Sequence, residues 1–248
     1  MDKVNRGPFD SVFLSDVHLG WGKVSTEPFF KLLESIQTRS LYLVGDIFEW
    51  MYRRSGWINF EMVRFAKWLR NQIECGVSVT LISGNHDERL LGAAQEASWC
   101  DEWISGIRRS PYAVHNSRSG RKYLVVHGDL YDHIGVHPYT WKKSLAEFGY
   151  PIYLRLLQWF PKSNWLKLLR DMKQQDSVMQ HHINAFRDVM IRLAGLHGCD
   201  GVICGHIHFP QRWVEGAIEY LNCGDWLEYR SFVAESQTGD EGFSLHYA

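Results

Sequence analysis

The sequence predicts an α/β fold, in which an alternating first half is followed by a strand-rich second half. Three short apolar runs in the first half alternate with two amphipathic segments, and this β-α-β-α-β order predicts parallel strands with helices on the sheet faces. After residue 110 most of the predicted elements are strands. Polar residues that can bind metals follow five of the predicted strands.

Length and composition restrict the class of protein. The 248 residues fit a single domain, residues 1–248, with an insertion, and 45% hydrophobic residues with a net charge of −1 are typical of a globular chain without a nucleic-acid-binding surface. No apolar run approaches 18 residues, and Met1–Asp10 lacks the apolar core of a signal peptide. Five cysteines without a C-x-x-C pair favour a reducing, cytoplasmic location.

In the first half, the predicted strands are Ser11–Ser15, Leu41–Val44 and Ser78–Ile82, because each is a short β-branched or Leu-rich run. Thr26 is a candidate N-cap for a helix with Pro28 in its first turn. The second helix is predicted from Ile58 to Ile73, with Gly76 as its stop.

In the second half, the alternation gives way to strands and one long interruption. The predicted strands are Tyr112–His115, Lys122–Val126, Gly201–Cys204, Ala217–Leu221, Leu227–Ala234 and Phe243–Tyr247. Residues 133–195 interrupt this pattern and are predicted to be helical, with a helix from about Ser177 to Leu193.

Two interpretations of the 133–195 insertion remain open. Residues 139–165 hold eight aromatic side chains, and residues 151–173 carry five basic side chains against one acidic one. One interpretation is an insertion that packs its own small core. The other is an apolar, basic-rimmed lid for an acyl or membrane-interfacial substrate.

The candidate metal ligands are two carboxylates, one carboxamide and four imidazoles, without sulfur. They are Asp16, His18, Asp46, Asn85, His127, His206 and His208. Seven ligands exceed one tetrahedral ion but suit two ions that share a carboxylate, an arrangement used in phosphoryl transfer. Imidazole with oxygen ligands favours Mn²⁺, with Fe or Zn²⁺ as alternatives.

The motif set D-x-H…GD…GNHD…HGD…GHIH resembles the calcineurin-like metallophosphoesterases from about residue 11 to residue 224. Within that superfamily the chain is most similar to the UDP-2,3-diacylglucosamine diphosphatases of lipid A synthesis, through Gly45–Glu49, the insertion after His127-Gly128-Asp129 and Asn222–Trp226. One departure is His86, where the lipid A enzymes have Arg. The resemblance implies a four-layer α/β/β/α sandwich with a helical lid at residues 133–195.

The resemblance also implies roles for these residues. Asp16, His18, Asp46 and His208 would hold one metal, and Asp46, Asn85, His127 and His206 the other, with Asp46 bridging. His86 would be a general acid that does not bind a metal itself, or a structural histidine fixed by Asp87. Asp132 would contact the substrate or form a turn, and Glu49 would orient an imidazole or face solvent. An acyl chain would lie among the lid residues Trp141, Tyr153, Leu157, Trp159 and Phe160.

The leading hypothesis is therefore a two-metal hydrolase that cuts the diphosphate of a nucleotide-linked acyl sugar or a related lipid phosphoester. It would be cytoplasmic and would touch the inner membrane surface through the lid. The first alternative is a soluble phosphodiesterase or phosphatase acting on nucleotides or phosphoproteins. A non-catalytic protein-binding scaffold is the remote alternative, because such scaffolds lose ligands that this chain retains.

Overall fold

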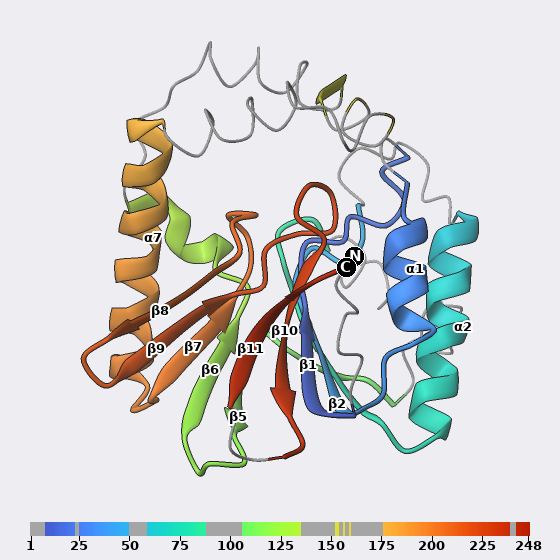
Figure 1. Cartoon of the computed structure of the whole chain (residues 1–248), viewed down its shortest axis with the longest axis horizontal. Coiled ribbons are helices and arrows are strands. Elements are labelled where there is room, and N and C mark those ends of the chain that lie inside the picture. Colours follow the sequence, from blue (N-terminus) through green and yellow to red (C-terminus); the bar gives the residue numbers. More distant parts are fainter. Residues whose placement is uncertain are drawn as a thin grey trace.

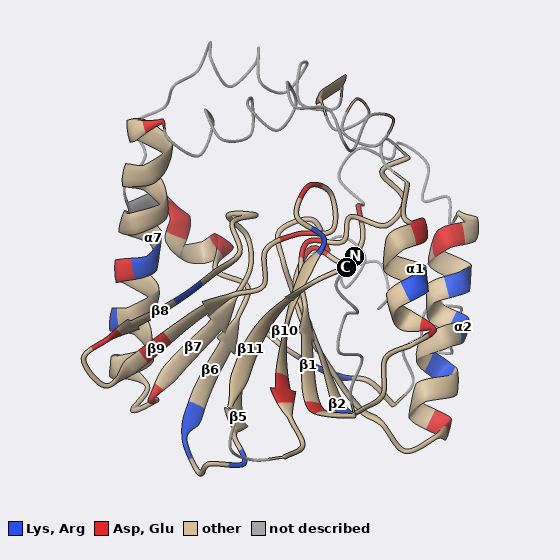
Figure 2. Ribbon diagram, viewed as in Figure 1, with Lys and Arg blue, Asp and Glu red and all other residues tan. Residues whose placement is uncertain are grey.

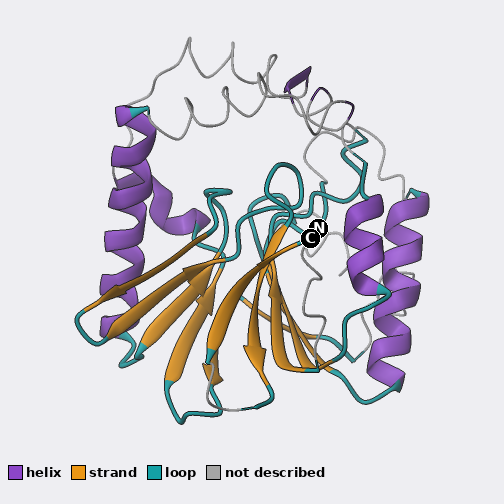
Figure 3. Ribbon diagram, in the orientation of Figure 1, coloured by secondary structure: helices purple, strands orange, loops and turns teal. Residues whose placement is uncertain are grey.

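In the computed structural model, two β-sheets lie face to face between helices (Figures 1 and 3). The structure describes residues 8–22, 25–49, 59–87, 106–134, 152–153, 156, 159, 176–238 and 242–248. Helices α1 and α2 cover one sheet and α7 covers the other, which gives the order α/β/β/α (Figure 3). The predicted four-layer sandwich is confirmed.

The first sheet has the strand order β11-β10-β1-β2-β3-β4. Its strands are β1 (Phe9–Leu14), β2 (Thr38–Val44), β3 (Ser78–Ile82), β4 (Arg108–Ser110), β10 (Ser231–Ser236) and β11 (Phe243–Tyr247). The pairs β1–β2 and β2–β3 are parallel, as the β-α-β-α-β pattern predicts. Helices α1 (Glu27–Leu33) and α2 (Phe60–Glu74) connect these strands.

The second sheet has the strand order β5-β6-β7-β9-β8. Its strands are β5 (Tyr112–Asn116), β6 (Lys122–Val126), β7 (Gly201–Cys204), β8 (Gln211–Glu215) and β9 (Ile218–Asn222). The pairs β6–β7 and β7–β9 are parallel, so the strands that precede His127 and His206 end at the same edge. A 3₁₀ turn, η1 (Asp129–Ile134), follows β6.

Three clusters of buried side chains fill the three interfaces between the layers. Phe29, Phe65 and Leu69 pack α1 and α2 against the first sheet. Phe13, Val125 and Ile203 belong to the cluster between the two sheets. Phe186 and Met190 of α7 (Ser177–Leu196) pack against the second sheet. Each sheet thus buries both faces, which explains its apolar strands.

Helix α7 belongs to the sandwich itself, because its buried face packs against the second sheet. Residues 177–195 of the predicted lid therefore form the fourth layer. The lid stays a prediction for residues 133–176, most of which lie outside the described residues.

Two strands were missed and several predicted boundaries differ from the observed ones, most of all that of the strand predicted at Leu227–Ala234. β4 and β8 are short and largely exposed, so they lack the apolar pattern of a strand. The predicted strand Leu227–Ala234 begins only at Ser231. The preceding residues form a turn because the Asp225 carboxylate accepts hydrogen bonds from the backbone N–H groups of Glu228 and Tyr229, both at 2.8 Å.

Candidate metal centre

Left-handed backbone turns present most of the predicted ligands. Asp16, His18, Asp46, His206 and His208 all have positive φ, between 51° and 70°. This conformation is uncommon for residues other than glycine and costs on the order of 1–3 kcal/mol each, and such residues cluster at functional sites. On an extended chain, residues two apart such as Asp16 and His18 would point to the same side. The two residues instead converge through tight turns beyond the end of β1.

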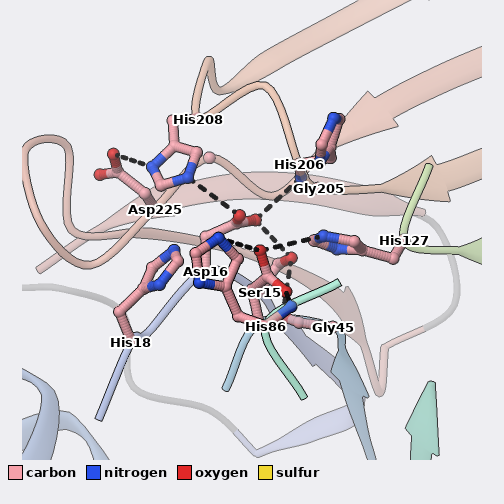
Figure 4. A network of polar contacts seen from close by, with 12 residues as sticks. Ser15, Asp16, His18, Gly45, His86, His127, Gly205, His206, His208 and Asp225 are labelled. Carbon is pink, nitrogen blue, oxygen red and sulfur yellow. Dashed lines mark hydrogen bonds and ion pairs between the residues drawn. The ribbon is translucent and has the colours of Figure 1, made fainter. Parts of the chain in front are cut away.

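Hydrogen bonds between the turns lock them together. The N–H groups of Asp16 and His18 donate to Gly45 O at 3.1 Å and Asp46 O at 3.0 Å. The N–H of His206 donates to Asp16 Oδ2 at 3.0 Å, and that of His86 donates to Asp46 Oδ1 at 2.8 Å. Turns from both sheets therefore form one interlocked edge (Figure 4).

The ligand side chains gather into two groups that meet at Asp46. Asp16, His18 and His208 form one group whose ligand atoms lie within 4.8 Å of one another, and Asp46, His127 and His206 form another. Asp46 also forms a group with His18 and His86, so its carboxylate lies between the two sets. A carboxylate in this position suits a bridge between two cations, because its charge offsets their repulsion.

Five buried ligand atoms identify where ions fit. Among the described residues, nine buried side-chain nitrogen or oxygen atoms have no hydrogen-bond partner, and five of them belong to the predicted ligand set: Asp16 Oδ1, His18 Nε2, Asn85 Oδ1, His127 Nε2 and His206 Nδ1. Buried polar atoms without partners are costly and rare in proteins. Because all five belong to the predicted ligand set and are nitrogen or oxygen donors, the site fits divalent cations of the Mn²⁺, Fe or Zn²⁺ type.

A polar partner fixes the orientation of each ligand imidazole. His18 Nδ1 lies 2.8 Å from Glu49 Oε2, His208 Nδ1 lies 2.9 Å from Asp225 Oδ2, and His127 Nδ1 lies 2.9 Å from Val44 O. In these rings Nδ1–H donates and Nε2 faces the site. His206 is reversed, because its Nε2 lies 3.1 Å from Asp132 Oδ2 while Nδ1 lies without a partner.

Glu49 holds His86 as well as His18. Its Oε1 lies 2.8 Å from His86 Nδ1, and the side chain is buried. Burial raises the pKa of Glu49, but hydrogen bonds from both rings lower it, and the net direction is down. Burial lowers the pKa of His86, but Glu49 and Asp46 raise it, and the net direction is up. Of the two roles left open for Glu49, the structure shows the one that orients an imidazole.

Opposite charges stabilise the ionised forms at the centre of the site. Burial alone would raise the pKa values of Asp16 and Asp46, but the neighbouring imidazoles bring both below their ordinary values. Burial would lower the pKa of His127, whereas Asp46, with Oδ2 at 3.3 Å from Nε2, raises it to about 10. The metal-free site therefore holds protons where metals would bind.

Asp87 supports the turns rather than the His86 ring. Its buried carboxylate accepts hydrogen bonds from the N–H groups of Ile47, Phe48 and Gly84. Burial and the charge of Asp46 raise the pKa of Asp87 to about 7. The residue thereby joins the turn after β2 to the turn after β3.

The predicted substrate residues are only partly described. Asp132 Oδ2 lies 3.1 Å from His206 Nε2, and Asp132 Oδ1 lies 3.4 Å from His182 Nε2 of α7. These contacts support a role for Asp132 in orienting His206. The hydroxyl of Tyr153 donates to Glu228 Oε1 at 2.9 Å, and Trp159 is 73% exposed. Trp141, Leu157 and Phe160 lie outside the described residues. Asp225 lies in the segment Asn222–Trp226 that contributes to the family resemblance, but the sequence did not indicate that it would contact His208.

Most of the sequence matches a known family. The family model for calcineurin-like phosphoesterases matches residues 11–210, and the chain belongs to this family. It is a metal-dependent phosphoester hydrolase.

Curated relatives cover nearly the whole chain. A Nitrosococcus oceani protein named UDP-2,3-diacylglucosamine hydrolase is 27% identical to this chain over 247 residues, covering 92% of this chain and 91% of that protein. A Vibrio vulnificus protein of the same name is 26% identical, covering 95% and 96%. Among solved structures, an archaeal phosphodiesterase aligns with a TM-score of 0.47 and 12% identity, covering 96% of this chain and 99% of that one.

Proposed function

We propose that the protein is a two-metal hydrolase that cleaves the diphosphate of a UDP-linked, acylated sugar. The observation that carries this proposal is its similarity, over more than nine tenths of the chain, to proteins named UDP-2,3-diacylglucosamine hydrolase. The two groups of ligands that meet at Asp46 support the dinuclear part of the proposal.

In this proposal, Asp16, His18 and His208 hold one ion, Asn85, His127 and His206 hold the other, and Asp46 bridges them. Mn²⁺ is the expected metal, with Fe or Zn²⁺ as alternatives. When bound, two such ions neutralise phosphoryl charge and lower the pKa of bound water toward neutrality.

His86 is proposed to act as the general acid. Its Nδ1 donates to Glu49, and its Nε2 faces the centre at 3.9 Å from Asp46 Oδ2. The raised pKa favours the protonated form of this ring, whose Nε2–H can donate to a phosphoryl oxygen or to the departing oxygen.

The acyl part of the substrate is proposed to contact the lid residues Trp141, Tyr153, Leu157, Trp159 and Phe160. The exposure of Trp159, in a segment rich in aromatic and basic side chains, supports contact with an apolar or interfacial surface. No helix among the described residues is long and apolar enough to cross a membrane. We therefore expect a cytoplasmic protein whose lid contacts the inner membrane surface peripherally.

The test is a substrate comparison with the Mn²⁺-loaded protein, using UDP-diacylglucosamine, bis-p-nitrophenyl phosphate and p-nitrophenyl phosphate. The acylated nucleotide sugar should give the highest kcat/KM. Asp46→Ala should abolish turnover of every substrate and lower the bound metal, because it removes the shared ligand. Normal turnover with full metal content in this variant would end the two-metal proposal.

A chain-length series then tests the substrate class. Because burial of one methylene is worth about 0.8 kcal/mol, a substrate shortened by four carbons should bind roughly 3 kcal/mol more weakly. Equal kcat/KM for all chain lengths, including the deacylated substrate, would favour a phosphodiesterase for soluble substrates instead.

A further inference from the structure

Asp225 is a fully buried carboxylate in the turn that follows β9, outside the ligand set. Its Oδ2 lies 2.9 Å from His208 Nδ1. Its Oδ1 accepts hydrogen bonds from the N–H groups of Glu228 and Tyr229, both at 2.8 Å. Both oxygens are thus engaged, and the carboxylate cannot rotate without breaking a hydrogen bond in a buried site.

The turn that carries Asp225 is attached to two ligand turns. The N–H of Trp226 donates to Asp16 O at 3.1 Å. The Asn222 carboxamide donates to Gly205 O at 2.8 Å and accepts from Gly224 N–H at 2.9 Å. The Asp225 carboxylate is therefore fixed relative to both Asp16 and His208.

This arrangement determines which His208 nitrogen faces the site. A carboxylate only accepts hydrogen bonds, so the Nδ1 that faces Asp225 must carry a proton. The other nitrogen, Nε2, lies 3.2 Å from Asp16 Oδ1, on the side of the ring that faces the site (Figure 4). We propose that Asp225 is the positioning residue of one metal site, where it presents Nε2 of His208 to the ion held with Asp16 and His18. This inference rests on the proposed dinuclear function.

The effect of Asp225 should be confined to this one site. In the other group, His127 is oriented by Val44 O and His206 by Asp132, whose side chain is 30% exposed. None of these contacts includes the Asp225 turn. A change at Asp225 should therefore weaken the binding of only one of the two ions, whereas a general loss of stability would weaken the binding of both.

The chain offers a matched control at the other end of the sheets. Glu235 is also buried; its Oε2 lies 2.9 Å from His115 Nε2, and its Oε1 accepts from Arg118 N–H at 2.7 Å. Like Asp225, Glu235 is a buried carboxylate that contacts one imidazole and accepts a backbone hydrogen bond, but its imidazole is not a proposed metal ligand. Asp225→Asn removes a buried carboxylate that contacts a proposed metal ligand, and Glu235→Gln removes one that contacts a histidine outside the ligand set. The two variants therefore distinguish an effect on the metal site from the general effect of losing a buried carboxylate.

The experiment is a Mn²⁺ binding isotherm for the wild type and both variants, with paramagnetic resonance to detect coupled ion pairs. In Asp225→Asn, the carboxamide N–H₂ faces Nδ1, which favours the opposite ring tautomer. One ion should then bind about 10- to 100-fold more weakly while the other keeps its wild-type affinity. Glu235→Gln should bind both ions as the wild type does. Unchanged binding in Asp225→Asn, or equal weakening of both ions, would overturn the proposal.

A measurement on the intact protein covers the case in which Asp225→Asn does not fold. In ¹⁵N spectra of the Zn²⁺-loaded wild type, with His208 assigned through His208→Gln, Nδ1 should carry the proton. An unprotonated Nδ1 would overturn the role of Asp225. If the wild type binds only one ion, the two-metal function is wrong. The protonation of His208 Nδ1 would still test the role of Asp225 in that case.

Discussion

His86 and His18 share one buried carboxylate, that of Glu49, with each ring at 2.8 Å. One ring belongs to the proposed ligand set, and the other carries the proposed catalytic proton. Because both nitrogens that face Glu49 donate to it, the opposite nitrogens are directed toward the proposed metal site and the proposed substrate. Glu49 thereby orients both the proposed metal ligand His18 and the proposed general acid His86.

His86→Ala should lower kcat by about 10²- to 10⁴-fold, the usual range for one general acid, and should leave the metal content near that of the wild type. The reason is that the ring contacts Glu49 and Asp46 but adds no atom to the proposed coordination of either ion. Elemental analysis beside steady-state kinetics measures both quantities. Loss of metal in proportion to activity would make His86 a ligand or a structural support.

Metal binding should release protons, because the carboxylates beside His127 and His208 favour the protonated forms of these two rings before an ion binds. Although burial lowers the pKa of His127 and that of His208, the carboxylates beside them raise the first to about 10 and the second well above its usual value. Near pH 7, an ion must displace the Nε2 protons, so affinity should rise with pH by about tenfold per unit for each proton displaced.

Titration calorimetry in two buffers of different ionisation enthalpy measures this proton release. The number of protons should fall as the pH rises through 10, where His127 loses its proton before the metal arrives. A binding heat that is the same in both buffers at pH 7 would contradict the protonated metal-free site.

At the scale of elements, the site depends on how closely the ends of β1 and β7 approach each other. A Cβ on Gly205 would meet Ser15 Oγ and the Asp16 carboxylate, so only glycine fits after β7. Gly205→Ala should therefore destabilise the fold by about 1–3 kcal/mol and weaken metal binding.

The matched control is Gly195→Ala in α7. A Cβ there would make only an ordinary contact of 3.5 Å with Ile218, and alanine is the better helix former. This variant should be neutral or more stable by roughly 0.5–1 kcal/mol, with unchanged metal affinity. Denaturant unfolding and metal titration of the two variants provide the comparison. Equal effects of the two substitutions would contradict close packing at Gly205.

The sequence predicted the strands whose two faces are buried, because such strands are continuous apolar runs. β3 has the predicted bounds Ser78–Ile82 and β6 has the predicted bounds Lys122–Val126. β8 was missed because most of its residues are exposed and include Arg212 and Glu215. Its place in the sheet depends on pairing with β9, a non-local interaction that local periodicity does not record.

The candidate ligands were predictable because their residue types recur at strand ends, but the particular rings that their supports orient were not. Glu49 and Asp225 are single carboxylates without a repeating pattern, and they meet His18 and His208 only after folding. The left-handed backbone of Asp16 and His18 could not be predicted either, because aspartate and histidine do not indicate such turns in a sequence as glycine does.

At the scale of the whole molecule, each group of ligands combines residues from both sheets. Asp16, His18 and Asp46 follow strands of the first sheet, whereas His127, His206 and His208 follow strands of the second. Figure 2 shows acidic residues in the loops at this edge, while the helices carry charges of both signs. Ions bound here would cross-link the sheets at one end, and the buried pair His115–Glu235 joins β5 to β10 at the other.

Removal of metal should therefore lower the stability of the entire fold. An ion at 100 times its Kd stabilises the native state by about 2.7 kcal/mol, because it binds the folded chain and not the unfolded one. For a chain of this size, that corresponds to a fall in Tm of roughly 5–10 °C on chelation with EDTA. Scanning calorimetry of the Mn²⁺-loaded and chelated protein measures the difference.

Two variants show whether this loss arises at the ion-binding edge. Asp46→Ala should have a Tm that chelation hardly changes, because the shared ligand is absent. Glu235→Ala should be less stable than the wild type, because it leaves His115 buried without its carboxylate, yet it should keep the full chelation shift. If chelation removes the ions and the wild-type Tm does not move, then the sheets are held together without them, and the ions act in chemistry alone.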